Sequence, residues 1–191
     1  MKSKTQPTHR PSPDLTPSLV AKLRAGDAEA GALLNELYRQ AMIRFCWGYL
    51  GKVEEAEDAA QTVFCKVIEA TEVPNHFRAW LYKIARNHCL NVLRGRARRR
   101  DDRPLPSDSR LAVDLTGNLT RLVRQELRSR IVHLLGALPA SQREALRLRY
   151  AEDLPRAEIA YVLDIPESVV KSRLFEGLKK LREHSSLLDD D

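Results

Sequence analysis

Two neighbouring segments carry opposite charge, and their residue types point to two kinds of binding chemistry. From Glu54 to Glu72 the chain has six acidic residues and one base, whereas from Asn75 to Arg100 it has eight basic residues and no acid. An asymmetry of this kind indicates two different partners, one of them polyanionic. The formal net charge of +6 over 191 residues conceals this division.

The basic segment combines cations with aromatic rings on one side of a helix predicted over about residues 75–98. The apolar face of this helix comprises Phe77, Leu81, Ile84, Ala85, His88 and Val92. The other side carries Lys83, Arg86, Asn87 and Arg94, with Trp80 and Tyr82 at its two rims. Cations neutralise phosphates, and an aromatic ring stacks on a base with about 1–3 kcal/mol. The pattern favours an unstacked nucleic-acid strand as ligand; the alternative is that the rings pack on the preceding helix and the cations are only solvated.

The acidic segment predicts a helix from about Glu54 to Thr71, which Pro74 ends. On a helical wheel, the small apolar residues Ala56, Ala60, Val63 and Val67 share one face. Asp58, Gln61 and Cys65 lie on the opposite face. By the wheel alone, this polar face is an ordinary solvated surface.

Two short helices near the C-terminus, at about residues 155–163 and 167–183, have the dimensions of a helix-turn-helix. We expect the first to pack on the second through Ile159, Val162, Leu163, Val170, Leu174, Leu178 and Leu181. The second helix then presents Ser172, Arg173, Glu176, Lys179 and Lys180 outward, with Phe175 on the rim. Such side chains can reach base edges in a major groove, but a structural hairpin with a charged surface has the same spacing.

The rest of the chain is also predicted to be helical. We expect helices at about residues 16–24, 27–50, 115–138 and 141–151, the last beginning in a capping box from Ser141 to Glu144. Prolines at 104 and 106 mark a linker. Because no alternating pattern predicts a strand, the sequence predicts an all-α protein of two small helical domains joined by a flexible linker.

Other classes of protein are disfavoured by the composition. No apolar run of about 18 residues could span a membrane, and the N-terminus lacks the apolar stretch of a secretory signal. Cys46, Cys65 and Cys89 match neither a disulfide framework nor a zinc site, so we expect a reducing cytoplasm. Without GxGxxG, GxxxxGK[ST] or HExxH motifs, and without histidines beside the dense acids, we expect no enzyme, no metal and no cofactor.

Three segments resemble the bacterial extracytoplasmic-function (ECF) sigma factors of RNA polymerase. AEDAAQTVF at 56–64 is similar to the family's AEDxxQxxF, and FRAWLYKIARN at 77–87, with Asn91 and Arg94 after it, to FxxWLxxIARN…LR. LPASQRE at 138–144, EIA at 158–160, LDIP at 163–166 and VKSRL at 170–174 are similar to LPxxQRE…EIA…LGIPxGTVKSRL. The motifs follow the family's order and spacing over about residues 15–97 and 120–184.

The resemblance implies a transcription initiation factor that binds core RNA polymerase, recognises the minus-ten and minus-thirty-five promoter elements and promotes DNA melting. Its implied partners are the β′ coiled coil and β flap of the polymerase, promoter DNA and an anti-sigma factor, with no membrane insertion. The implied parts are a flexible tail at 1–14, a sigma region 2 domain at 15–97, a linker at 98–119, a region 4 helix-turn-helix domain at 120–184 and an acidic tail at 185–191.

The resemblance also assigns residues to each contact. Polymerase binding would involve Asp58, Gln61 and Phe64. The minus-ten element would be bound by Asn75, His76, Arg78, Trp80, Lys83, Arg86, Asn87 and Arg94. The minus-thirty-five element would be bound by Ser168, Lys171, Ser172, Arg173, Phe175, Glu176 and Lys179.

The sequence departs from the family pattern in region 4. Pro155 replaces the usual serine, and we expect it at the first position of its helix with Asp153 as the cap. Asp164 replaces the turn glycine and must adopt a positive φ. Val169 replaces a threonine, so the sequence does not define which minus-thirty-five element is bound or how tightly. It also does not define the regulon, the inducing signal or a redox role of the cysteines.

A stand-alone helix-turn-helix regulator that dimerises on duplex DNA is the alternative function. Such a protein needs a dimer interface and a palindromic site. This chain instead has a second helical domain that bears the polymerase-like motif, which favours the initiation factor.

Overall fold

The structure is a computed structural model that describes residues 17–70, 74, 76–99 and 135–188. Across these residues every regular element is an α-helix, which confirms the predicted class. The helices are α1 (Pro17–Arg24), α2 (Ala28–Leu50), α3 (Val53–Glu69), α4 (Phe77–Arg99), α6 (Ala140–Tyr150), α7 (Arg156–Leu163) and α8 (Glu167–Leu188). The predicted tails and the predicted helix at 115–138 lie largely or wholly outside the described residues, as does the predicted linker beyond the end of α4.

The N-terminal domain consists of α1 to α4, and local sequence signals set the ends of its longest helix. The Asp27 carboxylate accepts hydrogen bonds from the backbone N–H groups of Glu29 and Ala30, at 2.9 and 3.2 Å, and so caps α2. Gly51 ends α2 in the left-handed region, with φ of 76°, which a glycine adopts without steric cost. Both boundaries agree with the prediction.

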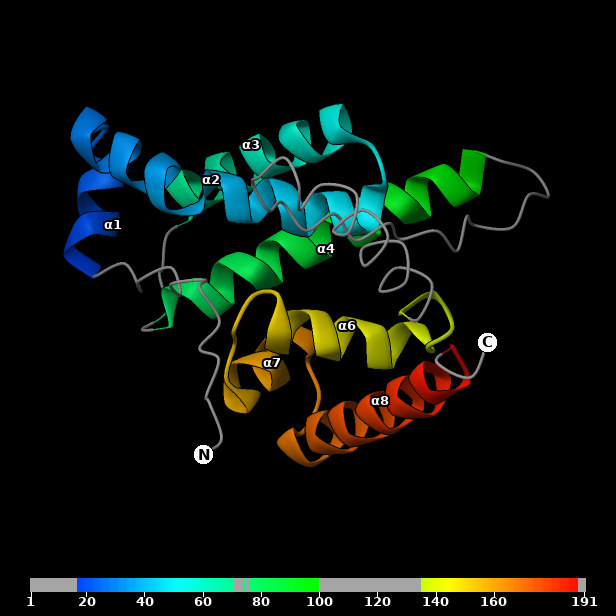
Figure 1. Ribbon diagram of the computed structural model, residues 1–191. Helices are drawn as coiled ribbons and strands as arrows, with labels where there is room; N and C mark the ends of the chain where they lie inside the picture. The colour runs from blue at the N-terminus through cyan, green and yellow to red at the C-terminus, as the bar shows by residue number, and fades with distance from the viewer. Residues whose placement is uncertain (1–16, 71–73, 75, 100–134, 189–191) are drawn as a thin grey trace, which may run out of the picture.

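The core of this domain forms where α2, α3 and α4 meet (Figure 1). Tyr38 of α2 packs edge-to-face on Phe77 of α4, with ring centroids 5.7 Å apart. The predicted apolar face of α3, represented by Ala56 and Val63, is buried against them. Burial of apolar surface is the main stabilising term of such a bundle, and it fixes which face of α3 remains outside.

The C-terminal domain packs α6 against α8, with α7 beside both. Gly177 allows the close approach of α8, because a Cβ atom there would lie 2.8 Å from Leu146 Cδ1 of α6. The predicted hairpin contact is present: Ile159 of α7 and Val170 of α8 are buried in the core. The turn between α7 and α8 places Asp164 at φ of 58°, as expected for a residue at the glycine position.

Two predicted helix starts are wrong. The capping box is not formed, because Pro139 is the N-cap of α6 without a side-chain hydrogen bond and Glu144 is engaged elsewhere. Pro155 is the N-cap of α7 rather than its first residue, and Asp153 does not cap this helix. The backbone of α7 therefore begins without side-chain capping.

The two domains are in direct contact in this chain. Figure 1 shows α4 between the α2–α3 layer and the group formed by α6, α7 and α8. One side of α4 packs on α2 and α3, and another side packs on α7. The sequence did not predict this second contact, and it decides the surroundings of the basic face of α4.

Candidate polymerase and nucleic-acid interfaces

The basic face of α4 divides into covered and exposed parts. His76, Asn87 and Arg94 are exposed, whereas Arg78 is buried with 8% of its surface exposed. The remaining described candidates, Trp80, Lys83 and Arg86, are partly buried, and Asn75 lies outside the described residues. The structure therefore brings the predicted residues together along one helix but covers several of them with the C-terminal domain.

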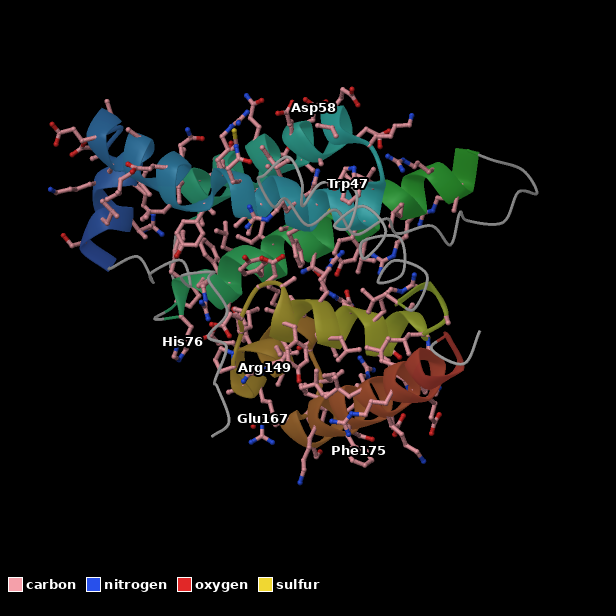
Figure 2. All side chains as sticks on the ribbon, in the orientation of Figure 1. Trp47, Asp58, His76, Arg149, Glu167 and Phe175 are labelled. Atoms are coloured by element: carbon pink, nitrogen blue, oxygen red, sulfur yellow. The ribbon has the colours of Figure 1, made fainter. Side chains whose placement is uncertain are left out.

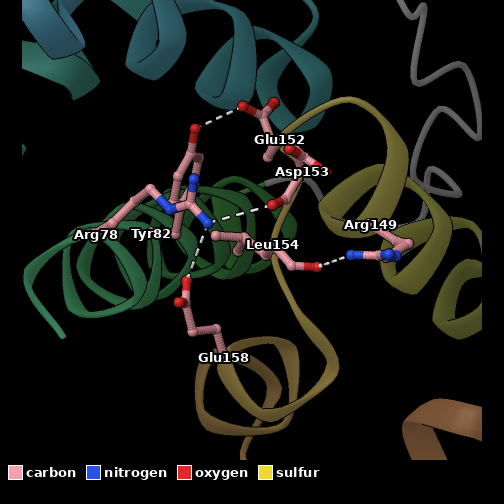
Figure 3. Close-up of polar contacts among 7 residues, drawn as sticks. All are labelled: Arg78, Tyr82, Arg149, Glu152, Asp153, Leu154 and Glu158. Atoms are coloured by element: carbon pink, nitrogen blue, oxygen red, sulfur yellow. Dashed lines mark hydrogen bonds and ion pairs between the residues drawn. The ribbon is translucent and has the colours of Figure 1, made fainter. Parts of the chain in front are cut away.

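Arg78 lies in the contact between α4 and the start of α7 (Figure 3). Its Nη2 donates hydrogen bonds to the backbone carbonyl oxygen of Asp153 at 3.2 Å and to Oε2 of Glu158 at 3.3 Å. The loop that carries Asp153 is held by Arg149 of α6, whose Nη1 donates to the carbonyl oxygen of Leu154 at 3.1 Å. The guanidinium of Arg78 therefore contacts groups of the C-terminal domain.

Tyr82 lies one turn after Arg78 on α4. The sequence predicts its ring at the rim of the nucleic-acid face, and this prediction is wrong. The side chain is buried, and its ring packs edge-to-face on Phe45 of α2 with centroids 4.9 Å apart. Its hydroxyl donates to Oε2 of Glu152 at 2.6 Å. Burial and the neighbouring carboxylate raise the pKa of Tyr82, so the hydroxyl stays a donor.

Lys83 and Arg86 also meet carboxylates of the C-terminal domain. Arg86 donates from Nε to Oε1 of Glu144 at 2.8 Å and from Nη2 to Oε2 at 3.3 Å, a two-point contact. Lys83 Nζ lies 3.6 Å from Oδ1 of Asp164 and 4.5 Å from the centre of the Tyr161 ring. Cations at three successive turns of α4 therefore have acidic partners in α6, α7 or the turn after α7.

Trp80 keeps a partly open position on α4. Its ring packs edge-to-face on Phe77, with centroids 5.8 Å apart, and the residue as a whole is partly buried. Trp80 is therefore neither fully buried nor fully exposed. Arg94, further along, donates to Oδ1 of Asn91 at 3.0 Å on the exposed surface.

The polar face of α3 is exposed on the side of the molecule away from the C-terminal domain (Figure 2). Asp58 and Gln61 are exposed, as is Cys65. Phe64 is partly buried and packs against the core at the edge of this face. The arrangement agrees with the helical wheel and leaves a polar surface with an apolar border.

The outer face of α8 is exposed at the opposite end of the molecule (Figure 2). Its exposed candidates are Ser168, Lys171, Ser172, Phe175, Glu176 and Lys179, and Arg173 is partly buried. Phe175 has 69% of its surface exposed, so its ring contributes little to the packing of its own domain. Glu176 accepts from Ser172 Oγ at 2.7 Å and from Gln142 Nε2 at 2.9 Å, so its carboxylate has a fixed orientation.

Comparison with known proteins assigns both domains. The Sigma-70 region 2 family matches residues 34–99, and the Sigma-70, region 4 family matches residues 128–181. The ECF RNA polymerase sigma factor SigW of Bacillus subtilis is 28% identical over 177 residues, covering 86% of this chain and 93% of SigW. The chain belongs to the Sigma-70 family of sigma factors.

One more curated relative and one solved structure are similar to this chain. The RNA polymerase sigma-H factor of Pseudomonas aeruginosa is 29% identical to this sigma factor over 169 residues, covering 83% of this chain and 88% of the relative. The solved structure of the sigma factor RpoE with the anti-sigma factor NepR, from Bartonella quintana, matches the fold with a TM-score of 0.61 at 23% identity. It covers 81% of this chain and 96% of that chain. The region 2 match also disfavours a stand-alone helix-turn-helix regulator.

Sequence reasoning missed the residues of this sigma factor that join the two domains. Glu144, Glu152 and Glu158 supply carboxylates to α4, and Arg147 of α6 lies over the Phe45 and Tyr49 rings of α2. The excess of cations on α4 was the available signal, because guanidinium and ammonium groups attract carboxylates as well as phosphates. The sequence did not say whether those partners would be phosphates or carboxylates.

None of the described helices is both long and apolar enough to cross a membrane. The described part of the sigma factor also contains no cluster of three or more His, Cys, Asp or Glu residues that could hold a metal ion.

Proposed function

We propose that this sigma factor binds core RNA polymerase in the cytoplasm and directs it to promoters through separate surfaces of its two domains. It acts by binding and performs no catalysis of its own. The observation that carries the proposal is a pair of exposed faces in a chain that matches both sigma regions. One face is formed by Asp58 and Gln61 on α3, and the other is the outer side of α8 at the opposite end of the molecule.

The polymerase contact is formed by the exposed face of α3. Asp58 and Gln61 offer a carboxylate and an amide to the β′ coiled coil, and Phe64 adds an apolar border. The opposite face of α3 is fully used by the core. Substitutions on the outer face therefore change partner binding with little effect on folding.

The minus-ten element is bound as a melted strand along α4 and the residues before it. Arg94 is exposed and neutralises a phosphate, and Arg78, Lys83 and Arg86 do the same once the carboxylates of the C-terminal domain leave them. Trp80 offers a stacking surface and Asn87 can read a base edge. Extruding a base costs a few kcal/mol. A helix with several cations and a partly buried tryptophan can offset that cost.

The minus-thirty-five element is bound as a duplex by α8, with the β flap holding the C-terminal domain on the polymerase. The exposed residues of α8 face outward at successive turns, as direct readout of a major groove requires. Lys171 and Lys179 suit flanking phosphates, and Arg173 suits a guanine edge.

A protein antagonist of the anti-sigma type is a further proposed partner. The relative from Bartonella quintana was solved with the anti-sigma factor NepR. An antagonist that covers both domains would block the faces described above.

Run-off transcription with purified core polymerase on genomic fragments tests the function. Addition of the protein should produce transcripts from defined start sites that core polymerase alone does not give. Failure to bind core, or binding without promoter-specific start sites, would contradict the proposal.

A further inference from the structure

We propose that Glu176 of α8 selects cytosine at one position of the minus-thirty-five element, and that Gln142 of α6 holds the Glu176 carboxylate in place for this contact. The inference deepens the proposed role of α8 in binding that element and rests on it. It assigns a base and a mode of recognition to Glu176. It assigns a positioning role to Gln142, a residue outside the recognition helix.

The Glu176 carboxylate is exposed on α8, yet it is held at both of its oxygen atoms. Ser172 Oγ, one turn earlier in the helix, donates to Oε1 at 2.7 Å, and Gln142 Nε2 donates to Oε2 at 2.9 Å. Each carboxylate oxygen can accept two hydrogen bonds. One acceptor position therefore remains on each oxygen, and the carboxylate is oriented before a ligand binds.

The Gln142 side chain is buried in a way that packing alone does not explain. It is 6% exposed, and its amide oxygen Oε1 is buried with no hydrogen-bond partner in the described part of the chain. A buried acceptor without a partner lowers the stability of the folded protein. An apolar side chain of similar size would fill the same space without that cost. The advantage of the amide lies in the N–H group that it directs at Glu176.

The contact between α6 and α8 does not depend on this hydrogen bond. A Cβ atom at Gly177 would lie 2.8 Å from Leu146 Cδ1 and 3.5 Å from Gln142 Cβ, so the glycine allows the two helices to approach closely. Leu146 and Val170 are buried in the apolar core. The hydrogen bond from Gln142 therefore adds an orientation for Glu176 to a contact that apolar packing already stabilises.

The four bases differ in what their major-groove edges offer to a carboxylate, which only accepts hydrogen bonds. Cytosine presents its N4 amino group as a donor, whereas guanine presents the acceptors N7 and O6 and thymine presents the acceptor O4. Adenine presents its N6 donor next to the acceptor N7, which repels a carboxylate. A carboxylate held in a fixed orientation therefore favours cytosine over the other three bases.

The neighbours of Glu176 on α8 fit a position in a major groove. Phe175, the preceding residue, has 69% of its surface exposed on the outer side of the helix (Figure 2). Lys171 and Lys179 are exposed on the same helix and suit flanking phosphates. Because lysines attract a duplex of any sequence, the carboxylate can disfavour the wrong bases without preventing binding.

Glu176→Gln tests the base contact, with Glu183→Gln as the matched control. Glu183 is also exposed and lies further along the same helix, so both variants lose one carboxylate from α8. The promoter found by run-off transcription is prepared with the bases of its minus-thirty-five element randomised. Duplexes that the complete polymerase binds are then separated and sequenced.

The wild type should require cytosine at one position of one strand. Glu176→Gln should reduce this preference about tenfold and favour adenine there, because a glutamine amide matches N6 and N7 of adenine. Glu176→Ala should lose the cytosine preference without gaining one for adenine. Glu183→Gln should keep the wild-type profile.

Gln142→Met tests the positioning role, because methionine fills the space but donates no hydrogen bond. It should weaken the preference for cytosine at the same position and leave the other positions unchanged. Combined with Glu176→Ala, it should cause no further change, because no carboxylate remains to be positioned. Weaker binding to all duplexes alike, with or without Glu176, would show a purely structural role and overturn the assignment of Gln142.

The wild-type run-off transcription separates this inference from the proposed function. Promoter-specific transcription together with an unchanged sequence profile in both Glu176 variants would overturn the inference and leave the function standing. A preference that disappears at a base other than cytosine would overturn the cytosine contact. Absence of promoter-specific transcription would remove the proposed function and this inference with it.

Discussion

The hydroxyl of Tyr82 in α4 donates a 2.6 Å hydrogen bond to Glu152, which follows α6 in the other domain and lies 70 residues further along the chain. Tyr82 is 2% exposed and Glu152 is 7% exposed. A buried carboxylate is costly unless it accepts hydrogen bonds. This pair therefore makes the contact between the two domains specific as well as close.

Tyr82→Phe should lower the free energy of unfolding of the whole chain by about 1–3 kcal/mol, the cost of removing a donor from a buried charged acceptor. The ring would keep its packing on Phe45. Urea denaturation measures the change, and Tyr150→Phe, at a residue with 64% of its surface exposed, is the control. Equal stability of the two variants would show that the hydrogen bond contributes nothing.

Asp58→Ala and Gln61→Ala should each weaken binding to core polymerase by roughly 1–2 kcal/mol, as expected for residues central to an interface. Both side chains are exposed, so the circular dichroism and the thermal unfolding of the free protein should not change. Titration with fluorescently labelled core measures the affinity. Glu36→Ala, at an exposed site on α2, is the control, and wild-type affinity in both α3 variants would exclude that face.

Asn87→Ala should slow open-complex formation while leaving duplex binding by the complete polymerase unchanged. Asn87 is exposed, whereas Trp80 packs on Phe77, so a substitution of Asn87 separates strand capture from folding more cleanly. Permanganate reactivity of unpaired thymines measures melting. Gln40→Ala on α2 is the control for loss of an exposed amide, and normal melting in Asn87→Ala would remove this residue from strand recognition.

Local rules predicted much of the fold because the groups they involve lie within a few residues of each other. Asp27 and Gly51 end their helix through contacts with adjacent turns, and the small residues of α3 follow one helical face. Asp164 adopts the left-handed conformation that its position in the turn demands. In each case, residues close in the sequence are enough to explain the local structure.

The domain contact was not predictable in the same way. Glu144 fits a local capping box, but its carboxylate instead meets Arg86, 58 residues away, because packing of α6 against α2 and α4 brings them together. On a helical wheel, Tyr82 lies at the edge of the cationic face. The wheel represents one helix alone, so it cannot show that a second domain buries this residue. The wheel gives the face of a helix, and only the tertiary structure shows what covers that face.

Arg173→Ala should reduce discrimination between the correct and a scrambled minus-thirty-five element by about 1–3 kcal/mol, if its guanidinium contacts a guanine edge. Lys179→Ala is the matched comparison, because loss of a phosphate contact weakens binding to both elements alike. Competition binding of the complete polymerase to the two duplexes measures the ratio. A ratio unchanged by Arg173→Ala would assign this residue to the backbone or to the fold.

The stability of the N-terminal domain should depend on pH through His88. Burial lowers the pKa of this imidazole, and the Lys66 ammonium on α3 acts in the same direction. The unfolded chain, with an ordinary pKa of about 6.5, therefore takes up the proton first as the pH falls. Stability is complete above that pH and is lost progressively below it, until the folded imidazole is protonated as well.

His88→Gln removes this titration, so the stability advantage of the wild type over the variant should shrink between about pH 7 and pH 5. Urea denaturation across that range measures it, with His76→Gln, at an exposed site before α4, as the control. The His76 variant should follow the wild-type curve. Parallel curves for the wild type and His88→Gln would show that the folded protein accepts the proton as readily as the unfolded chain, and that neither burial nor Lys66 affects His88.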